Sequence, residues 1–445
     1  MVQRNFLTSC TYHFALISLS YLLGAAAIFF ELPSSPFLRR AFVGGVSWYE
    51  HKRITPPPVD LLSPPTMRHT QKPGKTCDGF TLCLYGGYSR ARLINMRGEL
   101  VHEWHVPFSQ LWPAPPHLKG RIDDAAVYFN DGHIDPNGNL LAVIEGPINM
   151  QNMSHGYGLV KLDKDSRVLW TYAEKCHHDI DVAEDGTIYA LVNETLTQVP
   201  PELESVPTPC VVDHVDVISA NGERMKRIAL LEALLNSPYA ALFGTLERPK
   251  MPGPMTQRSS WQSPLADDKR RRDVLHANAV KVLNPTRASK FPFFKTGQLL
   301  VSLRNLDAIV VLDLDSGKVV WAARGPWRAQ HDPSFLENGR LLLFDNLGSP
   351  KGSRVLEYDP QTQAFPWTYP GDKGTPFHSE LRGMCQRLPG GNTLIVNSEG
   401  GEVIEATPDQ ETVWSCSFGH TVLYRARRYI PEQLPFLGSD QHARP

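Results

Sequence analysis

The chain has 445 residues, with 45 lysines and arginines against 46 aspartates and glutamates, and 42% of its residues are hydrophobic. This composition supports a large buried core and excludes a disordered or fibrous chain. The even charge balance predicts no nucleic-acid partner, because nucleic-acid-binding domains usually carry a clustered basic surface.

The N-terminal segment is apolar. No residue from 5 to 30 carries a fixed charge, and residues 14–30 are apolar or small. That length suits a short transmembrane helix or the apolar region of a signal peptide. The small residues 24–27 are followed by Ile28, Phe29 and Phe30, so no clean cleavage site is evident. We therefore expect one uncleaved transmembrane helix, a signal anchor over residues 1–32.

The flanking charges and the cysteines point to different sides of the membrane for the rest of the chain. Arg4 precedes the apolar segment, whereas Arg39 and Arg40 follow it, and this distribution counts against export under the positive-inside rule. Six cysteines follow the segment and allow three disulfides, the easiest pair being Cys77 with Cys83. Disulfides would place the domain in the periplasm or outside the cell. The alternative is that all six cysteines are free thiols, either buried or without a role.

Residues 33–76 are rich in proline and predict a stalk. From residue 77 to about 435 the chain repeats one element, in which an apolar strand and a tight turn lead to a second strand near a tryptophan. Five copies end near Trp104, Trp170, Trp321, Trp367 and Trp414, and a sixth, at 215–225, lacks the tryptophan.

A second element, a Gly-containing turn followed by an apolar strand, stands ahead of most copies. It begins at Asn137, Asp185, Thr296, Asn338 and Gly390. Two hairpins per unit make a four-stranded antiparallel sheet. The last three repeat tryptophans, at 321, 367 and 414, are 46 and 47 residues apart, which is the length of a propeller blade. We predict an all-β, six-bladed β-propeller over 77–435, with an insertion at about 233–272 and a tail at 436–445. A β-sandwich does not explain the regular spacing.

Several hairpins are preceded by a histidine or an arginine at a similar distance. In three units such a residue stands eight positions before the turn glycine; these residues are His178, His331 and Arg382. His133 stands five positions before its glycine. His276 opens the matching strand of the unit that follows the insertion, and Asn278 lies two positions later.

The first strand of each blade lines the central channel of a propeller, so equivalent positions converge on the axis. We therefore expect these side chains to face one small volume. Arg304 interrupts an apolar run after residues 299–303, and its planar guanidinium suits a tetrahedral oxyanion. The alternative for Arg304 is a salt bridge between blades, and any single histidine could be structural.

Other chemistries fit the sequence less well. No histidine pair has the i, i+4 spacing of a helical metal site, and no cysteine lies in register with a histidine as a ligand, so we expect no metal. No phosphate-binding loop or nucleophile-elbow motif is present, and no cofactor is expected.

Four segments in this order resemble the bacterial arylsulfate sulfotransferase family. They are His178-Asp-Ile-Asp-Val-Ala-Glu-Asp-Gly, Asp273-Val-Leu-His-Ala-Asn-Ala-Val, Val301-Ser-Leu-Arg304 and Gln330-His-Asp-Pro-Ser-Phe-Leu-Glu-Asn-Gly. The likeness covers roughly residues 77–435. It implies a periplasmic six-bladed propeller that moves a sulfuryl group from an aryl sulfate ester to a phenol without a nucleotide donor. The family's usual aromatic and serine are replaced here by Val274 and Ala279.

The resemblance also implies roles for individual residues. His331 matches the histidine that is transiently sulfated, His178 and His276 match the other channel histidines, and Arg304 matches the arginine that holds the sulfate. Asn278 matches the family's asparagine and, with Arg382 and His133, is expected to bind substrate.

Two other classes of function stay open at this point. One is a non-catalytic propeller that binds sulfated or other anionic ligands, which needs the cationic ring but no nucleophile. The other is a scaffold that uses its rim for protein contacts. The oligomeric state is also left open.

Overall fold

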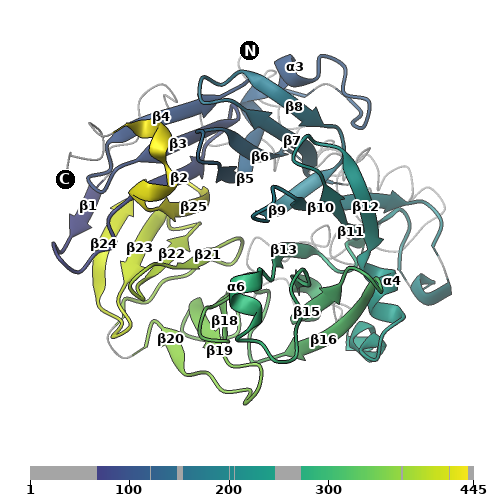
Figure 1. Ribbon diagram of the computed structural model, residues 1–445. Helices are drawn as coiled ribbons and strands as arrows, with labels where there is room; N and C mark the ends of the chain where they lie inside the picture. The colour runs from purple at the N-terminus through teal and green to yellow at the C-terminus, as the bar shows by residue number, and fades with distance from the viewer. Residues whose placement is uncertain are drawn as a thin grey trace, which may run out of the picture. The chain divides into compact units, whose positions relative to one another are not determined.

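The computed structural model describes residues 68–120, 122–147, 154–199, 201–204, 206–245, 272–371, 374–419 and 421–438. In this part of the chain six antiparallel sheets surround a common centre, as Figure 1 shows. The fold is a six-bladed β-propeller, as the sequence predicts.

Each blade begins with its innermost strand. Blade 1 consists of β5 (Tyr128–Ile134), β6 (Leu140–Glu145), β7 (Gly156–Leu162) and β8 (Val168–Tyr172). Blade 2 consists of β9 (Cys176–Val182), β10 (Ile188–Leu196), β11 (Cys210–Ile218) and β12 (Arg224–Ala229). Blade 3 consists of β13 (Ala277–Val282), β14 (Leu299–Leu303), β15 (Ala308–Asp313) and β16 (Lys318–Arg324).

The remaining blades follow the same plan. Blade 4 consists of β17 (His331–Phe335), β18 (Leu341–Asp345), β19 (Arg354–Tyr358) and β20 (Trp367–Tyr369). Blade 5 consists of β21 (Met384–Arg387), β22 (Thr393–Asn397), β23 (Glu402–Ala406), β24 (Thr412–Ser417) and β1 (Arg68–Gln71). Blade 6 consists of β25 (Leu423–Tyr429), β2 (Phe80–Tyr85), β3 (Arg90–Ile94) and β4 (Leu100–His105).

Short helices lie between the strands. Among the described residues the α-helices are α3 (Phe108–Leu111), α4 (Leu230–Leu235) and α6 (Pro285–Ala288). The 3-10 turns are η1 (Asp124–Ala126), η2 (Pro201–Leu203), η3 (Ala240–Thr245), η5 (Arg304–Leu306), η6 (Pro431–Gln433) and η7 (Pro435–Leu437).

The hairpin turns explain why the sequence repeats. The turn glycine between the first two strands has φ of 82° in blade 1, 83° in blade 2, 85° in blade 3, 80° in blade 4 and 87° in blade 5. These values lie in the left-handed region, which glycine enters without the steric cost that a Cβ brings. The tryptophan-bearing hairpins are the third and fourth strands of their blades.

The two ends of the described chain close the ring. The C-terminal strand β25 is the innermost strand of blade 6 and pairs antiparallel with β2 (Figure 1). Strand β1 pairs antiparallel with β24 and adds a fifth strand to blade 5. Because β1 spans Arg68–Gln71, the last part of the segment expected to be a stalk belongs to the propeller instead.

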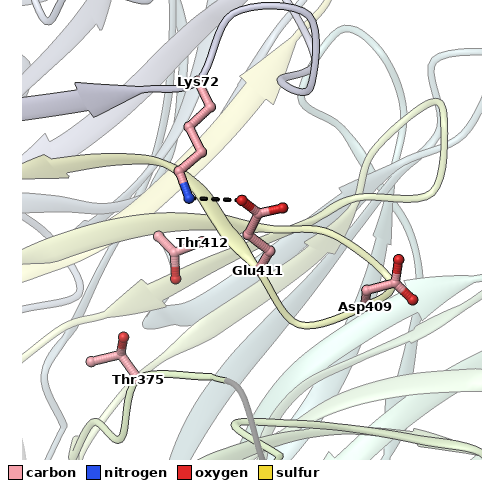
Figure 2. A pocket seen from close by; sticks show the side chains of 5 residues that line it. All are labelled: Lys72, Thr375, Asp409, Glu411 and Thr412. Carbon is pink, nitrogen blue, oxygen red and sulfur yellow. Dashed lines mark hydrogen bonds and ion pairs between the residues drawn. The ribbon is translucent and has the colours of Figure 1, made fainter.

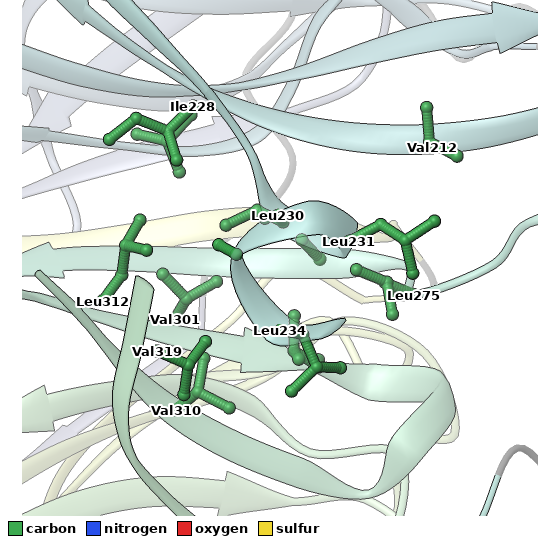
Figure 3. Close-up of a cluster of buried hydrophobic side chains, with 14 of the residues drawn as sticks. Val212, Ile228, Leu230, Leu231, Leu234, Leu275, Val301, Val310, Leu312 and Val319 are labelled. Carbon is green, nitrogen blue, oxygen red and sulfur yellow. The ribbon is translucent and has the colours of Figure 1, made fainter. Parts of the chain in front are cut away.

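Apolar side chains fill the space between blades. Helix α4 buries Leu230, Leu231 and Leu234 against strands of blades 2 and 3, including Val212 and Val301 (Figure 3). The chain after blade 2 thus packs on the propeller before it reaches 246–271, the main part of the predicted insertion, which lies outside the described residues.

The expected anchor and disulfides are not seen. Residues 1–32 lie outside the described part, and within that part no helix is long and apolar enough to span a membrane. Cys77, Cys83, Cys176, Cys210, Cys385 and Cys416 form no disulfide with one another. The proposed pair Cys77–Cys83 is therefore wrong, and cysteine pairing gives no support for an oxidising compartment.

A buried ion pair fastens blade 5 to blade 6. Arg428 in β25 lies 3.2 Å from Oε2 of Glu405, and both side chains are fully buried. The guanidinium carbon also lies 4.7 Å from the centroid of the Trp414 ring, and Nε donates a hydrogen bond to Thr81 Oγ1. A buried charge is tolerated only while its partner and hydrogen bonds remain.

We expect Arg428→Met to lower the free energy of unfolding by about 3–5 kcal/mol, because it leaves Glu405 charged and buried without its cation. Urea denaturation measures this loss. The matched control is Lys72→Met in the exposed pair with Glu411, which should cost at most about 1 kcal/mol. A loss for Arg428→Met no larger than that of the control would contradict this account of blade closure.

Candidate active site

Four of the innermost strands carry a β-bulge near their first residues. The unmatched residues are Asn130 in β5, His178 with Asp179 in β9, Asn278 in β13, and Asp332 with Pro333 in β17. A bulge inserts extra residues, bends the strand and re-aims its side chains. The repeated bulge therefore gathers chemically active side chains at one end of the channel.

A small cavity lies where these strand ends meet. It is lined by Asn130, His178, His331, Arg382, Gly383, Tyr424 and Arg425, which come from blades 1, 2, 4, 5 and 6. Its volume is about 10 Å³, which is room for roughly one water molecule. A larger ligand therefore enters only if side chains around the cavity move.

The hydrogen bonds of His331 determine which ring nitrogen carries its proton. Nδ1 lies 2.8 Å from Oδ1 of Asn346 and 3.0 Å from the carbonyl oxygen of Ala329. The amide nitrogen of Asn346 donates to two carbonyl oxygens, those of Ser379 and Arg382, so its oxygen must face His331. Both neighbours of Nδ1 are acceptors, and Nδ1 therefore holds the proton. In the neutral ring Nε2 keeps its lone pair.

His331 is 5% exposed. Burial lowers the pKa of His331 well below its usual value, and the positive charge of Arg304 adds to this effect. The imidazole is thus neutral near pH 7, which is the form that can act as a nucleophile.

The hydrogen bonds of His178 give it the opposite tautomer. The amide nitrogen of Asn193 donates to Oδ1 of Asp213 at 2.7 Å and to Nε2 of His177 at 2.9 Å. Because Nε2 of His177 accepts, its Nδ1 carries the proton and donates to Nδ1 of His178 at 2.7 Å. His178 therefore carries its proton on Nε2.

His178 is also held by its backbone and its surroundings. Its N–H donates to Oε1 of the buried Glu145 at 2.6 Å, and its φ is 57°, in the left-handed region. Burial lowers the pKa of His178 well below its usual value, with further lowering by His155, His276 and His177. The side chain is thus a neutral N–H donor beside the cavity.

His276 is paired with a carboxylate. Its Nδ1 lies 2.5 Å from Oδ2 of Asp273, and its ring centroid lies 4.9 Å from that of His178. The carboxylate accepts the Nδ1 proton and leaves Nε2 available for proton transfer, as in other histidine–carboxylate pairs. The backbone of Arg304 is held next to His276, because the backbone N–H of Arg304 donates to the carbonyl oxygen of His276 at 3.2 Å.

Arg382 belongs to an aromatic stack at the cavity. Its guanidinium carbon lies 4.6 Å from the ring centroid of Tyr424, which stacks on Tyr128 at 4.1 Å. Nη2 of Arg382 donates to the Tyr128 hydroxyl, which donates to Oε2 of Glu145 at 3.2 Å. Glu145 therefore links Arg382 to the backbone of His178.

Two of the residues predicted to bind substrate lie elsewhere. Asn278 is fully buried, and its amide donates to the carbonyl oxygen of Gln330, so it holds the backbone ahead of His331. His133 lies three residues further along β5 than Asn130, and its charged neighbours are Arg427, Asp131, Asp135 and Lys161. The expectation that His133 faces the same volume as the other histidines is not met.

The sequence contained a signal for the residue that replaces His133. Asn130 stands eight positions before Gly138, the same spacing as His178, His331 and Arg382 in their units. Asparagine does not stand out at that spacing as a candidate for catalysis, whereas histidine and arginine do. Glu145, His155 and Asn193 have no comparable signal because they lie in or beside second and third strands, and His177 lies one position outside the shared spacing.

A larger hollow lies beside β1 and β24 and has a volume of about 470 Å³. It is lined by Lys72, Thr375, Asp409, Glu411 and Thr412 (Figure 2). Lys72 and Glu411 form an exposed ion pair across it, at 2.7 Å. These side chains include no nucleophile comparable to His331, so the histidine cavity is the better candidate.

Comparison with solved structures gives distant similarities. A protein of unknown function from Bacteroides caccae matches with a TM-score of 0.46 and 12% identity, over 76% of this chain and 93% of that chain. A streptogramin B lyase matches with a TM-score of 0.39 and 10% identity, over 78% and 86%. Virginiamycin B lyase from Staphylococcus aureus matches with a TM-score of 0.38 and 10% identity, over 82% and 88%. Similarities of this size carry no conclusion about activity.

A search of curated proteins finds no match to the sequence. A family model described as arylsulfotransferase (ASST) matches residues 135–419, which is more than half of the chain. This range includes His178, His276, Arg304 and His331. The protein belongs to the arylsulfotransferase family.

Proposed function

We propose that the protein transfers a sulfuryl group from an aryl sulfate ester to a phenolic acceptor, with His331 as the nucleophile. The observation that carries this proposal is the tautomer of His331. Its Nδ1 proton is held by Asn346 and Ala329, so the lone pair of Nε2 is available at a channel cavity. Family membership supplies the reaction class.

In the first half of the reaction, Nε2 of His331 attacks sulfur while the bond from sulfur to the aryl oxygen breaks. Sulfuryl transfer, like phosphoryl transfer, is expected to spread charge over the three equatorial oxygens. Arg304 and the Nε2–H of His178 are the groups that stabilise this charge. The departing aryl oxide takes a proton from Nε2 of His276, whose Nδ1 is hydrogen-bonded to Asp273.

In the second half, an acceptor phenol attacks the sulfur held on His331. Nε2 of His276, now neutral, takes the phenol proton, and the bond between sulfur and Nε2 of His331 breaks. The product is a new aryl sulfate, and both histidines return to their starting states. Each half resembles the reverse of the other, which is the pattern of ping-pong catalysis.

We also propose that residues 1–32 anchor the chain in a membrane, with the propeller in the periplasm or outside the cell. Support comes from the uncharged segment 5–30 and from its length. Detergent extraction of the full chain, compared with a chain lacking residues 1–32, would decide whether this segment holds the protein in the membrane.

The transfer proposal predicts that the wild-type protein releases 4-nitrophenolate from 4-nitrophenyl sulfate when phenol is present and forms phenyl sulfate. His331→Asn should reduce kcat/KM by at least about 10³-fold, because the nucleophile is removed. Arg304→Ala should also reduce kcat/KM strongly, through loss of charge stabilisation.

The matched control is His378→Asn, which removes an exposed histidine and should leave the rate unchanged. Wild-type activity retained in His331→Asn would refute the assigned nucleophile. A well-folded wild type that binds aryl sulfates without transfer, over a panel of donors, would favour the anion-binding function instead.

A second prediction concerns Asn346, which does not contact the reacting atoms in this scheme. Asn346→Ala lets the His331 proton move to Nε2, which blocks the nucleophilic lone pair. We expect kcat to fall by about 10²-fold or more with little change in KM, as expected when a histidine adopts the wrong tautomer. Steady-state kinetics give both values.

The control for this change is Asn338→Ala, in the turn between β17 and β18 of the same blade, which should leave kcat unaltered. Equal kcat values in Asn346→Ala and the wild type would show that this asparagine does not determine the reactive state of His331.

A further inference from the structure

A cluster of ring nitrogens lies beside the cavity, behind His178. His155 immediately precedes β7, and His177 and His178 are adjacent in β9. One ring nitrogen from each of these three histidines lies within 4.8 Å of the other two. Nδ1 of His178 is 2.7 Å from Nδ1 of His177 and 3.2 Å from Nε2 of His155.

Hydrogen bonding alone accounts poorly for this arrangement. Nδ1 of a neutral imidazole that accepts a hydrogen bond offers a single lone pair in the ring plane. The proton of His177 already occupies the lone pair of His178, yet the nitrogen of His155 approaches the same atom. Three imidazole nitrogens gathered within 4.8 Å of one another are instead typical of a metal site.

We propose that three histidine nitrogens bind one divalent transition-metal ion of the Zn²⁺ type. They are Nδ1 of His177, Nδ1 of His178 and Nε2 of His155. Imidazole nitrogen suits Zn²⁺, Cu²⁺ and Ni²⁺ and does not suit Mg²⁺ or Ca²⁺. Three histidine ligands leave a fourth position of a tetrahedral ion unfilled by histidine. His177 and the bulge residue His178 thereby act together with His155 of the neighbouring blade.

Groups around the cluster match what metal-bound histidines require. When the ion takes Nδ1 of His177, its proton moves to Nε2, and the amide nitrogen of Asn193 that now donates to Nε2 must turn away. Oδ1 of Asp213, 3.4 Å from Nε2, then accepts the proton. A carboxylate that accepts the outer proton of a ligating histidine commonly accompanies such sites. Oε1 of the buried Glu145 lies 3.6 Å from Nε2 of His155 and is a candidate for the fourth position.

The ion would influence the cavity through one shared residue. His178 is both a ligand and a cavity-lining side chain. When Nδ1 of His178 binds the ion, the ring proton of His178 stays on Nε2, the nitrogen that does not bind the ion. The cation therefore fixes the same tautomer that the hydrogen bonds favour, and adds positive charge next to a site for an anion.

The test is metal binding by the full chain, which does not depend on whether the protein transfers sulfuryl groups. The chelator-treated protein is titrated with Zn²⁺ alone by calorimetry and with Co²⁺ alone by visible absorption. We expect one ion per chain and visible Co²⁺ bands typical of nitrogen ligands. His155→Ala and His177→Ala should each weaken binding by at least about 10-fold.

His378→Ala is the control, because it removes an exposed histidine that could bind metal non-specifically, and it should bind as the wild type does. Circular dichroism establishes that each variant is folded. If His155→Ala does not fold, His155→Gln takes its place, and the Co²⁺ spectrum of the wild type still reports the ligand type. Absence of binding by the wild type, or binding unaffected by the loss of His155, would overturn the proposal.

Discussion

The site rests on a set of buried carboxylates that join three pairs of neighbouring innermost strands. Asp131 accepts the N–H of Ile180, Asp179 accepts the N–H of Val280, and Asp332 accepts the N–H of Cys385. Three cations neutralise these carboxylates in the channel, and they are Lys281, Arg425 and Arg427. Removal of one member would leave an uncompensated buried charge, at a cost of about 3–5 kcal/mol. The bulged strand ends are thus fixed relative to one another, and so are the side chains that they carry.

The same fold gives chemically identical side chains different states. His331 meets two acceptors at Nδ1 and keeps a lone pair on Nε2, whereas His178 meets a donor at Nδ1 and keeps a proton on Nε2. His276 is tied to a carboxylate. A ring with a free Nε2 lone pair, a ring that donates from Nε2 and a ring paired with a carboxylate therefore stand close together, because each blade supplies its histidine with different partners. Arg425 lies within reach of three carboxylates and also donates to the carbonyl oxygen of His178, so it joins the carboxylate network to the cavity.

The number of blades could be predicted because glycine turns and tryptophans recur at the length of a blade. The grouping of His178, His331 and Arg382 could be predicted because equal distances from a turn put residues at equal depths in the channel. His133 does not line the cavity, because it lies five positions before its turn glycine and not eight. The partners that fix the tautomers, such as Asn346 and Asn193, were not predictable as such, because they come from neighbouring strands whose pairing the local sequence does not encode. Strand β1 was missed because it is four residues long and pairs with a strand more than 300 positions away.

The central claim is that Nε2 of His331 forms a covalent bond to sulfur. The most direct measurement is the reaction of the wild-type protein with 4-nitrophenyl sulfate in the absence of any phenol acceptor, followed by intact mass and peptide mapping under non-acidic conditions. The account predicts a burst of one equivalent of 4-nitrophenolate and a mass gain of one sulfuryl group, located on the peptide that contains His331. Transfer that proceeds only when donor and phenol are both present, with no burst and no mass gain, would contradict it and indicate direct transfer between the two substrates.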